Sequence, residues 1–222
     1  MLHFALTVAD MSTLTSAGPR RSSDSDARGS TRRPAGRILS GPLALVFLSE
    51  FCALTSFYLL LSVTPMYAAA AGTGSAGAGL VTSVLLLGTV AAELAAPILM
   101  RRYGYWAMLA AGALLLGGPA LALLPGGSLV IMVAVSAVRG LGFGLCTVIT
   151  GALTAVLLPP ERRGEGLGLF GVVATAPGIA ALPGGVWLAG HTGYPAAFAL
   201  TAVLMLAALP AARHERSAAG LR

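Results

Sequence analysis

The sequence predicts an all-α integral membrane protein, on three observations. Hydrophobic residues make up 56% of its 222 residues and charged residues only 10%. A soluble domain carries about 25% charged residues to cover its surface. The mean hydropathy of +0.85 is correspondingly high. Long uncharged stretches follow one another from Gly41 onward, and about 20 apolar residues in a helix cross the ~30 Å hydrocarbon core of a bilayer.

Six transmembrane helices are expected within residues 41–212. Their predicted ranges are 41–63, 79–100, 106–124, 128–157, 165–189 and 194–211. Helices satisfy their backbone hydrogen bonds internally, as the bilayer core requires. Residues 1–40, rich in Arg and Ser, are expected to form a disordered tail, and residues 213–222 a second polar tail.

The arginines predict the orientation of this bundle. All fourteen basic residues are Arg, and thirteen of them lie in the two tails or directly after the second and fourth predicted spans. Because Arg concentrates in cytoplasmic segments, both termini are expected in the cytoplasm and the protein in the plasma membrane. The use of Arg without Lys, together with abundant Ala, favours a GC-rich bacterial source. Nucleic acid is not an expected partner, because these charges are not gathered on one folded face.

Three charged side chains fall within predicted spans and away from their first residues: Glu50 near the middle of the first, Glu93 in the second and Arg139 in the fourth. A charge in the bilayer core costs at least about 2.5 kcal/mol, so it usually faces a cavity or a partner and marks a functional site. A buried carboxyl group favours its protonated form unless a cation is near. We therefore hypothesise a Glu50–Arg139 pair that a proton or the substrate disrupts. The alternative for Arg139 is a structural role, bound to helix carbonyl groups.

Uncharged polar side chains on the predicted spans are candidates for the lining of a solute cavity: Thr55, Tyr58, Ser83, Ser136, Thr147 and Thr150. Most of the Ser and Thr hydroxyls are expected to bond to their own helix backbone.

Glycine and proline are concentrated in the fourth and fifth spans. Gly140, Gly142 and Gly144 form a small-residue face, and the spacing of Gly140 and Gly144 favours close helix packing. The fifth span contains the helix-kinking Pro177 and Pro183, followed by Gly184 and Gly185.

Three segments stand in a defined order along the chain: ELAAPILMRRYGYW from Glu93, VRGLGFGLCTV around Arg139 and LPPERRGEGLGLFG from Leu158. In this order they resemble the N-terminal half of a major facilitator superfamily transporter, over roughly residues 41–212. The family's loop pattern Gly-x-Leu-Ala-Asp-Arg-x-Gly-Arg-Arg is matched at Arg102 and Gly104, whereas Arg101 takes the place of the Asp. Arg139 corresponds to the family's intramembrane arginine.

The resemblance implies a secondary active transporter of a small solute that works by alternating access, in which two six-helix halves rock around a site at mid-membrane. It makes Glu50, Glu93, Arg139 and Tyr58 candidates for substrate binding or proton coupling, and makes Arg101, Arg102 and Gly104 candidates for the loop element. Because the likeness covers one half of the family's architecture, a half-size or truncated transporter is expected, with a second half or a second copy of the chain as its partner. The alternative is a non-transporting membrane protein that interacts with a second half.

An enzyme is not expected from this sequence. An intramembrane protease needs a buried nucleophile with a histidine in reach, and His3, His191 and His214 all lie outside the predicted spans. The spacing of Cys, His, Asp and Glu indicates no metal site, and no cofactor is expected. A nucleotide-binding GxxxxGK[ST] loop is also absent from the sequence, so ATP is not the expected driving force.

Overall fold

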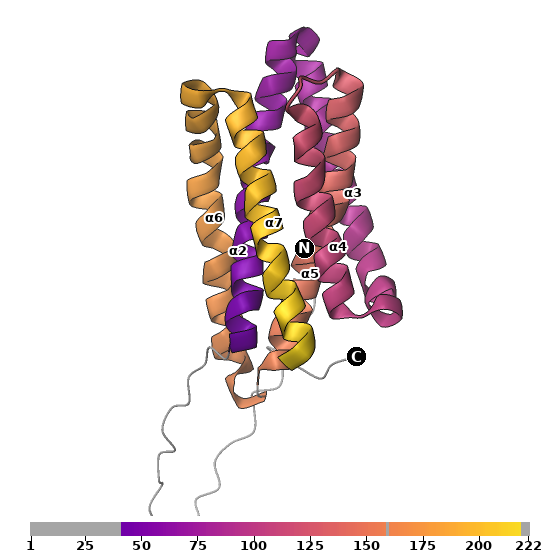
Figure 1. The fold of residues 1–222 in the computed structure, drawn as a ribbon, viewed down its shortest axis with the longest axis vertical. Coiled ribbons are helices and arrows are strands. Elements are labelled where there is room, and N and C mark those ends of the chain that lie inside the picture. The colour runs from indigo at the N-terminus through magenta and orange to yellow at the C-terminus, as the bar shows by residue number, and fades with distance from the viewer. Residues whose placement is uncertain (1–40, 159, 219–222) are drawn as a thin grey trace, which may run out of the picture. The chain divides into compact units, whose positions relative to one another are not determined.

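The computed structural model describes residues 41–158 and 160–218, with side chains at all of these positions except 42, 160 and 209–218. In this part of the chain there are six α-helices and no strand, so the all-α prediction is confirmed (Figure 1). The predicted tail 1–40 lies outside the described residues, as do the last four residues of the predicted tail 213–222.

The six helices follow the order of the predicted spans. They are α2 (Gly41–Ala68), α3 (Gly74–Tyr103), α4 (Tyr105–Gly117), α5 (Leu129–Leu157), α6 (Arg163–Thr192) and α7 (Tyr194–Ala218). A short segment, η2 (Ala69–Thr73), kinked at Gly72, joins α2 to α3, and the 3₁₀ turns η3 (Gly118–Leu123) and η4 (Pro160–Arg162) follow α4 and α5. The predicted loop between 63 and 79 is mostly helical instead. Four consecutive alanines at 68–71 explain this, because Ala is the strongest helix former.

The sequence predicts six separate membrane spans, and the lengths and hydropathies of the observed helices can be compared with this number. By length and hydropathy, four stretches are long and apolar enough to cross a bilayer: Leu43–Tyr103, Tyr105–Leu123, Leu129–Leu157 and Arg163–Thr192. The first is 61 residues long and includes both α2 and α3. In α7, the residues with described side chains, Tyr194–Ala208, form a shorter apolar helix. This criterion therefore supports a helical membrane protein but does not confirm the count of six.

Two of the turns between consecutive helices each consist of a single glycine with positive φ. Gly104, between α3 and α4, has φ +81°, and Gly193, between α6 and α7, has φ +85°. Each glycine amide donates to the carbonyl oxygen four residues earlier, that of Met100 at 2.9 Å and of Ala189 at 3.1 Å. A left-handed residue of this kind ends a helix without steric cost only when it is glycine. The chain can therefore reverse within one residue at both points.

The helices are arranged around α2 and α5. α5 packs against α3, α4 and α2, whereas α2 packs against α6, α7 and α5. Figure 1 shows α6 on one side of this pair and α3 on the other. The most apolar part of α6 is only 17% buried, compared with 56% for α5. α5 is thus an inner helix of the bundle, and α6 an outer one.

Candidate functional site

Three glycines of α5 allow the backbones of α3 and α4 to pack closely against the backbone of α5. A Cβ atom on Gly144 would lie 2.9 Å from the Cβ of Ala92 in α3, and one on Gly142 would lie 2.8 Å from the carbonyl oxygen of Gly112 in α4. Gly140 also faces the α3 backbone. Because α3 and α4 approach so closely, the position of α5 is well defined, and its polar side chains are held against α2.

Glu50 is the buried carboxyl group of the site. Its side chain in α2 is 1% exposed. Thr150 Oγ1 of α5 lies 2.6 Å from Glu50 Oε2, at hydrogen-bonding distance. The same hydroxyl oxygen lies 2.8 Å from the carbonyl oxygen of Cys146, one turn earlier in α5. The carboxyl group is therefore linked to α5 by a hydroxyl that has a second acceptor within reach.

Arg139, the charged group of α5, is 3% exposed and bonded to two other helices. Its guanidinium donates to the carbonyl oxygen of Leu116 in α4 and to that of Ser56 in α2, the latter at 3.0 Å. Leu116 stands three residues before Pro119, the proline of the 3₁₀ turn η3. Proline has no N–H, so the donor that a 3₁₀ turn would supply to this carbonyl is missing. Arg139 replaces it, as in the structural alternative considered for this residue.

The hypothesised pair of Glu50 and Arg139 is not formed in this structure. Across the described residues, no ion pair joins the two side chains. Arg139 contacts α2 at Ser56, six residues beyond Glu50, which places the two groups about 9 Å apart along the helix axis. The register of α2 against α5 explains the separation. It places Glu50 beside Thr150 and Arg139 beside Ser56, at different heights along α2.

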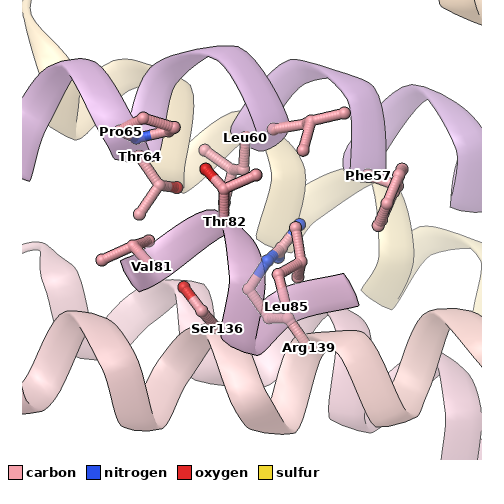
Figure 2. A pocket seen from close by; sticks show the side chains of 10 residues that line it. Phe57, Leu60, Thr64, Pro65, Val81, Thr82, Leu85, Ser136 and Arg139 are labelled. Carbon is pink, nitrogen blue, oxygen red and sulfur yellow. The ribbon is translucent and has the colours of Figure 1, made fainter. Parts of the chain in front are cut away.

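A small cavity of about 10 Å³ lies beside Arg139, between α2, α3 and α5 (Figure 2). This is room for about one water molecule. Ser136 and Thr64 both line it, are at least 95% buried and make no hydrogen bond within the part of the chain that the structure describes. The other lining residues are Phe57, Leu60, Leu61, Pro65, Val81, Thr82 and Leu85. The cavity thus offers the two hydroxyl groups of Ser136 and Thr64 and the edge of a guanidinium to a small polar molecule, whereas the Thr82 hydroxyl already donates to the Ala78 carbonyl oxygen.

Comparison with known proteins decides the family. The model of the Major Facilitator Superfamily matches residues 46–219, which include Glu50, Arg139 and nearly all of α2 to α7. The chain belongs to the major facilitator superfamily. A search of curated proteins found no match. Members of this superfamily are transporters, so the predicted membrane transport protein is confirmed at this level.

The remaining charged candidates of this superfamily domain lie at its surface. Glu93 is exposed on α3. Arg101 and Arg102 are exposed at the end of α3, where the Arg102 guanidinium lies 5.4 Å from the centre of the Tyr103 ring. Gly104 forms the turn that follows. None of these residues contacts Glu50 or Arg139 through a hydrogen bond or ion pair within residues 41–158.

The uncharged candidates divide into two groups. The hydroxyl groups of Thr55 and Thr147 donate to carbonyl oxygens four residues earlier, at 2.7 and 2.9 Å, as expected for helical threonines. Tyr58 is half-buried, with its ring 5.5 Å from that of Phe57. Ser83 is exposed on α3. Of the uncharged candidates, Thr150 thus bonds to Glu50, and Ser136 lines the cavity beside Arg139.

The prolines and glycines of α6 occupy both of its faces. α6 continues as one helix through Pro177 and Pro183. Pro177 and Gly185 are buried, and a Cβ on Gly185 would lie 2.7 Å from the carbonyl oxygen of Leu59 in α2. Pro183 is exposed, and Gly184 has no atom within 4 Å of its Cβ position.

Sequence reasoning missed Ser56, Thr64 and the Leu116 carbonyl group. A signal for the first two exists, because Ser49, Ser56 and Thr64 are seven and eight residues apart and so share one helix face. The carbonyl group is signalled only by Pro119, which removes a backbone donor near it. Which side chain would replace that donor depends on how α4 packs against α5.

Proposed function

We propose that this superfamily member is the six-span unit of a secondary active transporter that moves a small solute across the plasma membrane, coupled to protons through Glu50. The observation that carries the proposal is the burial of Glu50 in an apolar helix, with one side-chain hydrogen bond and no ion pair among the described residues. An ionisable group at membrane depth is expensive and is usually functional. Binding a proton removes its charge and changes which helix arrangement is favourable.

The proposed topology has six crossings with both termini in the cytoplasm. α2 and α3 share one 61-residue apolar stretch, but they pack against each other and are separated by Gly72, whose φ is +87°. Two crossings therefore account for this stretch better than one. Arginines lie at the α3–α4 and α5–α6 turns, and no Arg occurs between α2 and α3, between α4 and α5, or between α6 and α7. That asymmetry favours the cytoplasm for the arginine-bearing end.

We further propose that a second copy of the chain completes the solute path. α6 leaves most of its surface uncovered, and Glu93 is exposed on α3 within the apolar stretch. A carboxylate facing lipid is costly, so a protein surface or a water-filled path is expected there. α3 and α6 lie on opposite sides of α2 and α5 (Figure 1), so a twofold pair can place α3 of each copy against α6 of the other.

Pairing is tested by native mass spectrometry of the full chain in nanodiscs. A dimer is expected, and Ile179→Asn on the outer face of α6 should convert it to monomer. Leu114→Asn, at a half-exposed leucine of α4, is the control. A wild-type monomer would overturn the second-copy proposal.

Proton coupling is tested in liposomes that contain the purified chain and a pH-sensitive dye. A panel of neutral, anionic and cationic small solutes is added, and solute movement and internal pH are followed together. Glu50→Gln should abolish the solute-dependent pH change, whereas Glu165→Gln, the same change at a solvent-exposed ion pair, should not. An unchanged pH response in Glu50→Gln would contradict coupling at this site. A paired protein that moves no solute would instead support the non-transporting alternative.

A further inference from the structure

The hydroxyl group of Thr150 has more acceptors than protons. Its Oγ1 lies 2.6 Å from Glu50 Oε2, 2.8 Å from the carbonyl oxygen of Cys146 and 3.2 Å from that of Thr147. A hydroxyl group has one proton to donate and two lone pairs with which to accept. Thr150 therefore donates its hydrogen to one acceptor at a time.

Two proton arrangements fit the same heavy-atom positions. When Glu50 is ionised, Thr150 donates to Oε2 and stabilises the carboxylate. When Glu50 is protonated, its O–H donates to Thr150 Oγ1, and Thr150 donates to the Cys146 carbonyl oxygen. Both forms of the carboxyl group keep the hydrogen bond between Glu50 and Thr150.

From this geometry we propose that Thr150 is a positioning residue for the proton of Glu50, and that its hydroxyl hydrogen alternates between Glu50 and Cys146 as the carboxyl group loses and gains that proton. The inference rests on the proposed proton coupling at Glu50 and names the residue that regulates that site. It assigns the α2–α5 contact a different hydrogen-bond direction in each proton state.

The surroundings of Thr150 favour this role. Its side chain is fully buried, so bulk water does not compete for its hydroxyl group. Thr154 Oγ1 donates to the Thr150 carbonyl oxygen at 2.8 Å, and the glycine contacts of α5 with α3 and α4 limit its movement. The hydroxyl group is thus held at a defined distance from Glu50.

The titratable groups around Glu50 are few. The Cys146 thiol of α5 is close enough to interact with it electrostatically. On the other helices packed against α2, the charged groups with described side chains are Glu93 and the Arg101–Arg102 pair on α3, and Arg163 and Glu165 on α6. None of these forms an ion pair or hydrogen bond with Glu50. Arg139 is bonded to Ser56 and Leu116 in its own layer. Thr150 is therefore the neighbour whose removal tests the site most directly.

The test is an infrared pH titration of the full chain in nanodiscs, which follows the carboxyl band that disappears in Glu50→Gln. Thr150→Val has nearly the same shape but lacks the hydroxyl group, and Thr150→Ser retains it. We expect the midpoint of this band to move to higher pH by about one unit in Thr150→Val, because the carboxylate loses a hydrogen-bond donor. Thr150→Ser should restore the wild-type midpoint.

Thr154→Val is the matched control, because its hydroxyl group bonds only to the Thr150 carbonyl oxygen in the described residues. It should leave the midpoint unchanged. A wild-type midpoint in Thr150→Val, or an equal shift in Thr150→Ser, would overturn the role of Thr150 while leaving proton binding at Glu50 intact. If no titrating band is lost in Glu50→Gln, both this inference and the proposed coupling are overturned.

Discussion

α5 and α6 are both glycine-rich helices of nearly equal length, 29 and 30 residues, but their glycines have different surroundings. In α5, Gly140, Gly142 and Gly144 face the backbones of α3 and α4 so closely that an added Cβ atom would overlap them. In α6, several glycines have no atom within 4 Å of the Cβ position: Gly164, Gly168, Gly171, Gly184 and Gly190. Glycine therefore allows close helix packing in α5, whereas in α6 these glycines lie on a face that no other described helix covers.

This difference shows that glycine-rich sequence alone does not determine whether a helix face packs closely against another helix of the bundle. The glycines of α5 have their neighbours within this bundle. The outward glycines of α6 contact no other helix in the described part of the chain, and we propose that a second copy of the chain packs against them. Substitutions at the two sets therefore separate folding of the bundle from its pairing.

The largest expected effect follows from adding volume to the inner helix. Gly140→Val should lower the free energy of unfolding by about 3 kcal/mol, because the new side chain meets the α3 backbone, which cannot move aside. Gly184→Val in α6 should change it by less than about 0.5 kcal/mol, since its Cβ position is open. SDS-induced unfolding in mild detergent measures both. Equal losses in the two variants would remove the distinction between the helices.

A smaller loss of stability is expected when Arg139, which bonds α5 to α2 and α4, is substituted. Arg139→Lys keeps the charge, but one ammonium nitrogen cannot serve carbonyl groups on two helices with the geometry of a guanidinium. The free energy of unfolding should fall by about 1–2 kcal/mol, the cost of an unsatisfied buried carbonyl group. Arg102→Lys at the exposed end of α3 is the control, measured in the same unfolding assay. A wild-type stability for Arg139→Lys would contradict the capping role.

The inward face of α6 should behave like α5. Gly185→Ala would place a Cβ atom 2.7 Å from the Leu59 carbonyl oxygen of α2, so a loss of about 1 kcal/mol is expected in the unfolding assay. Gly171→Ala, on the outward face of the same helix, should show no loss. If the two alanine variants unfold alike, the outer position of α6 is not what sets the tolerance of its glycines.

The smallest effect is a gain. Gly151 is the glycine of α5 with no atom within 4 Å of its Cβ position, so Gly151→Ala adds helix propensity without a clash. The free energy of unfolding should rise by up to about 1 kcal/mol, the difference between Gly and Ala inside a helix. Destabilisation of this variant would mean that the whole of α5 is intolerant of side chains, and not only the face towards α3 and α4.

The sequence singles out the charged residues of the helices but does not determine their contacts. Glu50, Glu93 and Arg139 all lie in apolar helices, but only Glu50 and Arg139 are buried, so the sequence placed the charges along the helices without deciding which of them face the core. The hypothesised Glu50–Arg139 pair is not formed in this structure, because similar depth along two helices does not determine which side chains meet. Arg139 bonds to the Leu116 carbonyl group, which lacks an i+3 donor because Pro119 has no N–H, and Glu50 bonds to Thr150, one of six candidate polar side chains.

The helical class and the depth of each charged residue come from the sequence alone, because they depend on composition and on the rise of a helix in a bilayer. The family is also readable from its motifs, and the match over residues 46–219 confirms it. The partners of Glu50 and Arg139, and the burial of one glycine-rich helix beside the exposure of the other, depend on the register and rotation of helices against one another. Those are set by contacts between residues far apart in the chain, such as Glu50 with Thr150, and only the folded structure shows them.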